Sequence, residues 1–162
     1  MNKIIYMFIL SMLPVLEIRG SMIYALANNI NPALAFFLSV IGNILPIPFL
    51  ILLTQKVLQW LDTIDTFKPF VDWINKKAQE KSKTIDKYGR LGLYILVAIP
   101  LPGTGAWTGA LVASFLGLTP KKSMLPITLG VITAGIIVML STMGVLNLSL
   151  IHISEPTRQA EI

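Results

Sequence analysis

The sequence predicts an all-α integral membrane protein. Of its 162 residues, 54% are hydrophobic and 13% are charged, about half the charged fraction of an average soluble domain. Three uncharged runs, residues 33–53, 91–118 and 123–147, are each long enough to cross a hydrocarbon core of ~30 Å as a helix. The net charge of +5 comes from basic residues that flank apolar runs, so the positive-inside rule explains it better than nucleic-acid binding does.

The first apolar segment is interrupted by charge. Residues 4–16 are apolar, Glu17 and Arg19 follow, and residues 20–27 resume the apolar pattern. We predict two half-length helices that flank a polar break at Glu17 to Arg19, and Gly20, which directly follows it, is a candidate broken-helix residue. One longer span with a polar centre is an alternative. A signal peptide is another, because Lys3 and the Ala-Leu-Ala at 25–27 imitate its outer regions.

Residues 33–53 are expected to form the first full span. Asn43, Pro46 and Pro48 lie inside it. Proline loosens a transmembrane helix, and the Asn43 amide can bond to the exposed carbonyls or to another helix. A static kink is the structural alternative.

Residues 54–88 form the one extended polar region. Apolar residues recur there every three or four positions, which predicts one amphipathic helix, or two that are broken at Lys68-Pro69. Trp60, Trp73 and many basic residues suit the lipid headgroup layer, and a short soluble helical hairpin is the alternative. We interpret the carboxylates of the region as a solvated face: Asp62, Asp65, Asp72, Glu80 and Asp86.

The run 91–118 is broken in the middle. Two prolines and two glycines, Pro100, Pro102, Gly103 and Gly105, make a continuous helix costly. Irregular backbone at membrane depth requires protein or water to satisfy it, so we predict a re-entrant hairpin with residues 100–105 at its tip. Thr104, Trp107 and Thr108 lie beside this break. They are candidates for lining a substrate path, and packing against neighbouring helices is the alternative. Small residues at 105, 109, 113 and 117, Gly109 among them, predict close helix packing.

The two halves of the chain resemble each other weakly. Gly precedes Ala-Leu by five residues at Gly20 and at Gly105, and Pro precedes Gly by ten residues at 32/42 and at 120/130. We predict a single domain, residues 1–147, in which repeat one (about 4–54) and repeat two (about 91–147) flank the amphipathic region (55–90). A hairpin plus one full span crosses the membrane an odd number of times, so the second repeat is inverted. Lys121 and Lys122 then share the cytoplasmic face with the central basic region, and the N-terminus is outside. A four-span topology would place both lysines outside.

Residues 148–162 break the membrane pattern. They resemble the conceptual translation of a transposase-type sequencing adapter, and we expect them to be a non-native tail; an ordinary polar tail is the alternative. The single histidine, His152, lies in this segment, so we assign it no role.

Glu17 and Arg19 carry the chemistry that the sequence offers. An ionisable residue among apolar ones is by default a functional hypothesis, and an apolar environment disfavours the charged carboxylate, so a proton is the most natural ligand of Glu17. Arg19 holds an anionic group or snorkels to the interface. For Glu17, pairing with Arg19 or capping the broken backbone is an equal alternative, and for Arg19 alone snorkelling is the favoured interpretation. We expect no enzymatic activity, no cofactor and no metal site, because the membrane core offers one carboxylate and no Cys.

Three motifs make a family resemblance visible. Residues 13–20 (LPVLEIRG), 42–46 (GNILP) and 100–109 (PLPGTGAWTG) resemble the small multidrug export protein family, over about Leu10 to Leu140. That family is distantly similar to the DedA/VTT membrane proteins, and this similarity implies two re-entrant segments in an inverted repeat with roles in lipid translocation and proton-dependent homeostasis. Glu17 matches the acidic motif of those proteins, whereas the second half lacks their arginine.

The sequence therefore predicts a multi-pass protein of the cell membrane that acts as a proton-coupled transporter, an exporter or a lipid translocase. We expect membrane lipids and a second copy of the chain as partners, with an unidentified small molecule or lipid as substrate. A non-transporting membrane scaffold or homeostasis protein is the alternative.

Overall fold

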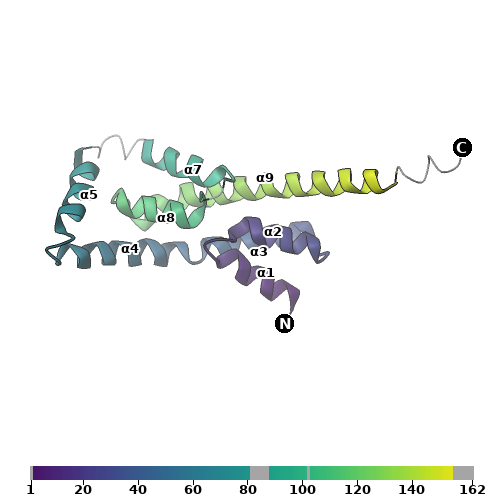
Figure 1. The fold of residues 1–162 in the computed structure, drawn as a ribbon, viewed down its shortest axis with the longest axis horizontal. Helices are drawn as coiled ribbons and strands as arrows, with labels where there is room; N and C mark the ends of the chain where they lie inside the picture. The colour runs from purple at the N-terminus through teal and green to yellow at the C-terminus, as the bar shows by residue number, and fades with distance from the viewer. Residues whose placement is uncertain (1, 81–87, 102, 155–162) are drawn as a thin grey trace, which may run out of the picture.

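The computed structural model describes residues 2–80, 88–101 and 103–154, with side chains described for residues 2–76, 88–101 and 103–144. These residues form α-helices joined by turns (Figure 1), which confirms the all-helical class predicted from the sequence.

The first apolar segment forms two helices, α1 (Lys3–Met12) and α2 (Glu17–Ala27). The Asn2 side chain caps α1 by accepting a hydrogen bond from the amide of Ile4 at 3.1 Å. The helix ends where Leu13 becomes extended, directly before Pro14, because proline disfavours the helical conformation in the residue that precedes it. In Figure 1, α1 and α2 diverge from this bend as a V. The segment is therefore two half-length helices and not one span.

The first full span is longer than the sequence predicts. Asn31 caps α3 (Pro32–Ile44) by accepting hydrogen bonds from the amides of Ala33 and Leu34. A turn at Leu45-Pro46 leads into α4 (Ile47–Asp62), so the chain is helical, with this one interruption, from Pro32 to Asp62. We expected the span to end at Leu53. The helix continues because no Gly or Pro follows Pro48 before Asp62, and Gln, Lys and Leu favour the helical state.

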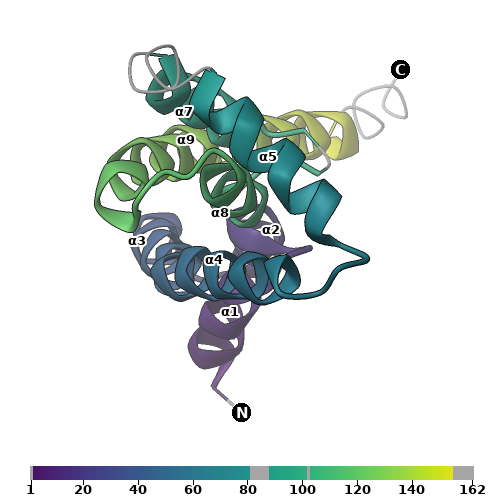
Figure 2. The same cartoon turned by 90° about the vertical axis from the view of Figure 1, so that its left-hand side faces the viewer.

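Helix α5 (Lys68–Glu80) is the amphipathic helix of the central region. The turn between α4 and α5 falls at residues 63–67, so the region is broken close to the predicted Lys68-Pro69. Pro69 occupies the first turn, where its missing amide costs nothing. Val71 and Ile74 are buried, whereas the Trp73 side chain is exposed. Figure 2 shows α5 crossing the end of the molecule at which α4 ends.

The second half repeats the pattern of a broken pair followed by a long helix. Helices α7 (Arg90–Ala98) and α8 (Ala106–Phe115) are separated by an irregular segment, and α9 (Pro120–Ser154) follows. Figure 1 shows α7 and α8 as a second V, with α9 running the length of the molecule. Helix α9 includes residues 148–154 of the segment expected to be a non-native tail; the remainder, 155–162, lies outside the described residues.

Glycines mark the closest helix contacts. A Cβ atom added at Gly42 of α3 would lie 2.0 Å from the Ser11 Oγ of α1. Added at Gly109 of α8 or Gly130 of α9, it would lie 2.6 Å from a Val97 side-chain atom of α7. The predicted close packing at Gly109 is therefore confirmed, and α7 is held between two glycine-bearing helices.

The molecule buries polar side chains and exposes large apolar ones. Serines at positions 11, 21, 39, 114 and 123 are buried, as are Glu17 and Asn43. In contrast, Phe37 and Phe49 on the first long span are 64% and 71% exposed, and Leu125 and Leu140 on α9 are 67% and 62% exposed. A soluble protein does not cover itself with large apolar side chains in this way, whereas a lipid bilayer solvates them.

Described basic residues of α4 and α5 lie at the same end of the molecule as those at the start of α9. Helix α9 begins at the end where α4 finishes and α5 lies (Figure 1). The side-chain amide of Gln55 in α4 donates a hydrogen bond to the carbonyl of Leu118, three residues before Lys121, at 3.0 Å. Lys121 and Lys122 therefore share this end with Lys56 of α4 and Lys68 of α5.

Candidate functional site

The two breaks in the helices meet, and their residues form the candidate site. We call this contact the central junction: Glu17 and Arg19 from the first turn of α2, directly after the first break, and residues 99–101 and 103–108 from the second break and the start of α8.

The main chain at Glu17 is unusual. Its φ is +46°, in the left-handed region that non-glycine residues occupy rarely and at a cost of about 1–3 kcal/mol. The amide of Glu17 donates to the carbonyl of Leu13 at 2.9 Å, which closes the turn between α1 and α2. Such a conformation persists only where the surroundings hold it, and here the contacts of the Glu17 carboxylate do so.

Threonine side chains organise the second break. The Thr104 hydroxyl lies 2.7 Å from the carbonyl oxygen of Ile99 and 2.8 Å from that of Leu101. The Thr108 hydroxyl donates to the carbonyl of Gly103 at 2.9 Å. Gly103 has a φ of +80° and Gly105 a φ of +155° with ψ −168°, and the latter conformation is essentially restricted to glycine.

Glu17 caps helix α8 from the other half of the chain. Gly105 stands at the N-cap of α8 and has no side chain to cap it. The Glu17 carboxylate, 5% exposed, accepts a hydrogen bond from the amide of Trp107 at 3.2 Å and lies at the amide of Ala106. A negative charge at a helix N-terminus is favourable, because unpaired amides and the helix dipole point toward it. Absence of a side chain at 105 is what makes room, since a Cβ there would lie 2.0 Å from Glu17 Oε2.

Arg19 contacts main-chain carbonyls of the segment that directly follows the C-terminus of α7. Its guanidinium donates to the carbonyl of Leu101, to that of Ile99 at 3.3 Å and to the Thr104 hydroxyl at 3.1 Å. A cation at a helix C-terminus is favourable for the same reason that an anion is favourable at the N-terminus. The two charged residues of the first break therefore contact the two helix ends of the second break, each at the end that matches its charge.

A third contact ties the second break to α1. The indole Nε1 of Trp107 donates to the carbonyl of Met12 at 3.1 Å, and this carbonyl belongs to the last residue of α1. Trp107 thus donates a hydrogen bond to a carbonyl at the C-terminus of α1, just as Glu17 and Arg19 bond to main-chain groups beside the ends of α8 and α7.

The structure brings together only part of the predicted site. Glu17, Arg19, Thr104, Gly105 and Trp107 contact one another in the central junction. Pro100 and Gly103 belong to its loop, and Thr108 lies in the first turn of α8. Pro102 lies outside the described residues. Of the other predicted residues, Gly109 lies in the packing between helices, against Val97 of α7, whereas Gly20 lies against Leu16 at the start of its own helix, α2. Pro46 and Pro48 stand at the start of α4.

Asn43 is buried but is not bonded as predicted. Its side chain is 0% exposed, and within the described part of the chain neither amide atom has a hydrogen-bond partner. The sequence analysis missed the main-chain carbonyls of Met12, Ile99 and Leu101, which no side-chain pattern encodes; the only available indication was that helix ends leave carbonyls open.

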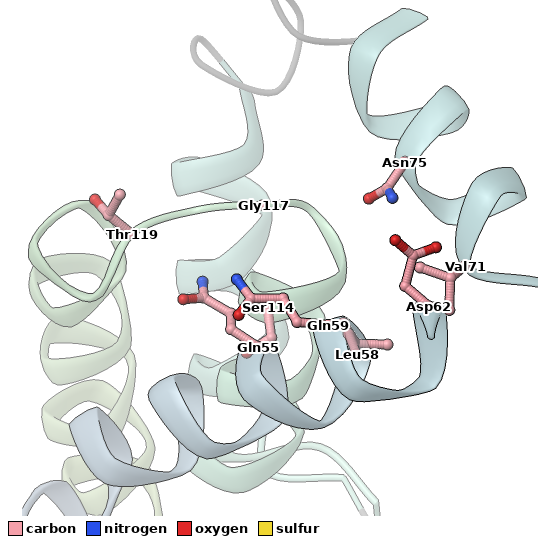
Figure 3. Close-up of a pocket in the computed structure, with 9 residues that line it drawn as sticks. All are labelled: Gln55, Leu58, Gln59, Asp62, Val71, Asn75, Ser114, Gly117 and Thr119. Atoms are coloured by element: carbon pink, nitrogen blue, oxygen red, sulfur yellow. The ribbon is translucent and has the colours of Figure 1, made fainter. Parts of the chain in front are cut away.

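A cavity lies at the end of the molecule that α5 covers. We call it the α5 cavity; it has a volume of about 330 Å³ and lies between α4, α5 and the turn from α8 to α9. Figure 3 shows the residues that line it: Gln55, Leu58, Gln59, Asp62, Val71, Asn75, Ser114, Gly117 and Thr119. Asp62 had been interpreted as part of a solvated face, and the structure instead places it, half-buried, in the wall of this cavity. The spacing of Gln55, Gln59 and Asp62 along one face of a helix could have indicated a polar wall.

Fold and site together define a class. Two apolar helical segments long enough to cross a membrane, Pro32–Asp62 and Pro120–Gly144, an exposed apolar surface and charged residues held at broken helix ends indicate a helical membrane protein. Residues 17–137 match the model of the family described as "putative small multi-drug export protein". The chain belongs to this family, as its three motifs predict. No curated protein and no solved structure matches the chain.

Proposed function

We propose that the chain is a proton-coupled membrane exporter in which the central junction acts as the gate and Glu17 exchanges the proton. The observation that carries this proposal is that Glu17 and Arg19, from one half, contact the ends of α8 and α7 in the other half. Family membership supports export as the activity.

Protonation of Glu17 changes the contact between the halves. The ionised carboxylate accepts the amide of Trp107 and faces the positive end of α8. A proton on Glu17 removes that charge and turns one acceptor oxygen into a donor, which weakens a charge-assisted hydrogen bond of about 1.5–3 kcal/mol. Arg19 is the other charged residue of the junction, and it keeps its hold on Leu101 in either state. Proton uptake therefore loosens the gate on one side only.

We further propose that the two V-shaped pairs are re-entrant segments of an inverted repeat. The pattern of two short helices and a long one runs in opposite directions in the two halves (Figure 1), which supports this arrangement. The basic end that contains Lys121 is then cytoplasmic and the N-terminus is outside. Cysteine labelling checks the topology directly, because the chain has no native Cys. An impermeant maleimide should label Asn29→Cys from outside and Lys121→Cys only after permeabilisation; external labelling of both would refute it.

A homodimer is part of the proposal. Few helices surround the central junction, so one chain encloses little volume, and a second copy would enlarge the path beside it. Light scattering of the purified protein in detergent measures the mass of the protein component, and a monomeric mass would refute the dimer.

The decisive experiment replaces Glu17 with Gln, which keeps the size of the side chain and removes the titratable group. Proteoliposomes with an imposed pH gradient are assayed for ethidium flux and, separately, for transbilayer movement of a fluorescent phospholipid. We expect Glu17→Gln to abolish the dependence of flux on the pH gradient, while Asp65→Asn, at an exposed turn, leaves it unchanged. The arm that responds identifies an exporter of small molecules or a lipid translocase.

The competing function is a membrane scaffold in which the same contacts only cap helices. The hydrogen bonds of Glu17 and Arg19 favour a scaffold, because contacts of this kind stabilise helix ends whether or not the protein transports a substrate. It predicts that Glu17→Gln lowers stability and that neither wild type nor variant moves a substrate. A folded Glu17→Gln protein with unaltered, pH-sensitive flux would refute proton exchange at this residue.

A further inference from the structure

The α5 cavity has walls of unequal chemistry. Leu58 and Val71 contribute apolar surface, while the other side chains of the wall are amides, hydroxyls and one carboxylate. Figure 3 shows Asp62 and Asn75 turned toward each other, with Gln55 and Ser114 on the opposite part of the wall. A volume of about 330 Å³ lies at the lower end of the ~300–1,000 Å³ range of small-molecule sites.

The charge of the cavity selects its ligand. Among the described residues that line it, Asp62 is the one charged side chain. An anion would meet this carboxylate without a cation to balance it, whereas an organic cation would be paired. The many basic residues of α4 and α5 do not reverse this, because none of those described lines the cavity.

The hydrogen-bonding groups favour a ligand that donates. The Gln55 amide nitrogen uses one of its two N–H groups on the carbonyl of Leu118 at 3.0 Å, which fixes the amide, and the amide oxygen is an acceptor for a ligand. The Ser114 hydroxyl donates to the main chain, 2.9 Å from the carbonyl of Ala110, which leaves its oxygen as an acceptor. Together with the Asp62 carboxylate, these atoms present acceptors to the cavity.

We propose that the α5 cavity binds an amidinium, guanidinium or primary ammonium compound, with its N–H groups on Asp62, Gln55 and Ser114 and a short apolar body against Leu58 and Val71. This inference deepens the proposed export function, because it names the substrate class and places substrate entry at the end of the molecule that α5 covers. Only the transport step rests on the proposed function; binding at the cavity does not. Two N–H groups of an amidinium match a carboxylate in a bidentate pair.

Benzamidinium is the probe, and benzoate, with the same ring and the opposite charge, is its control. Both are titrated against the purified protein in detergent by ligand-observed NMR. We expect saturable binding of benzamidinium with a Kd on the order of millimolar and none of benzoate. Asp62→Asn should weaken binding about tenfold, the loss expected for a charge-assisted hydrogen bond, and Asp65→Asn, the same change at a residue outside the cavity, should not. Asn75→Asp adds a second carboxylate and should tighten binding severalfold.

Equal binding of benzoate, equal effects of Asp62→Asn and Asp65→Asn, or no saturable binding by the wild type would each overturn the site. If Asp62→Asn does not fold, Asn75→Asp decides, and unchanged affinity overturns the site. The export function fails separately: benzamidinium that binds in an Asp62-dependent manner but is not moved by proteoliposomes refutes transport and leaves the site intact. Proton-driven ethidium flux with no benzamidinium binding refutes the site and leaves transport intact.

Discussion

Replacing Gly105 with Ala tests whether the central junction is as tightly built as its geometry requires. The new Cβ would lie 2.0 Å from Glu17 Oε2, whereas real Cβ atoms keep at least 3.0 Å, so the carboxylate must withdraw by about 1 Å. Its bond to the Trp107 amide, already 3.2 Å long, does not survive this shift. Losing a hydrogen bond to a buried charge costs about 1.5–3 kcal/mol, and the glycine-only conformation at 105 adds about 1–3 kcal/mol. We expect a total loss of about 2.5–6 kcal/mol in the free energy of unfolding.

Equilibrium unfolding by SDS in dodecyl maltoside micelles, followed by far-UV circular dichroism, measures this loss. Two controls separate its parts. Gly103 has a φ of +80°, and a Cβ added there would meet nothing within 4 Å. The loss of stability in Gly103→Ala therefore measures main-chain strain alone. In a Glu17→Ala background the collision is gone, and Gly105→Ala should cost only the strain. Equal costs of Gly105→Ala in both backgrounds, within about 0.5 kcal/mol, would refute the contact between Gly105 and Glu17.

The remaining predictions concern packing and the cation of the junction. Gly42→Ala places a Cβ 2.0 Å from the Ser11 Oγ and should destabilise the protein by about 1–3 kcal/mol in the same unfolding assay. Ser11→Ala should partly restore the stability of this variant. As a control, the new Cβ of Gly92→Ala meets nothing within 4 Å, so this change should be neutral or stabilising by up to ~1 kcal/mol. Equal effects at 42 and 92 would contradict the close approach of α1 and α3. Arg19→Lys keeps the charge but loses the planar fork that reaches three oxygens, and should cost about 1–3 kcal/mol; an unchanged midpoint would show that charge alone suffices.

The breaks of the helices were predictable because they depend on local chemistry. Pro and Gly at 100–105 interrupt an apolar run, and α7 ends and α8 begins on either side of them. The first break was predicted at the charged pair 17 and 19, but it lies at residues 13–16: α1 ends directly before Pro14, and Glu17 and Arg19 are in the first turn of α2. The small-residue spacing also predicted the close contact at Gly109. Each of these conclusions needs only the conformational limits of one residue or the period of one helix.

The partners across the breaks were not predictable in the same way. Arg19 bonds to main-chain atoms about 80 residues away, and every residue type supplies the same carbonyl. The predicted end of the first span at Leu53 also fell short of the helix end at Asp62, because polar residues such as Gln55 and Lys56 interrupt an apolar run without interrupting a helix. Asp62 belongs to a cavity only because α5 folds back over α4, which the pattern of one helix does not contain.

The reciprocal capping of the two breaks constrains the order in which the protein is made. Glu17 and its partner Trp107 are 90 residues apart, and at ~5–20 residues per second synthesis separates them by roughly 5–20 s. Throughout that interval Glu17 and Arg19 lack their partners, because the ends of α7 and α8 that they contact have not yet been synthesised. A charged break is costly in hydrocarbon on its own, so under the proposed re-entrant topology we expect α1 and α2 to reach their final depth only once α7 and α8 have entered the membrane. Assembly of the N-terminal half thus depends on the arrival of the C-terminal half, and a chain cut between the halves should insert correctly only when both pieces are made together.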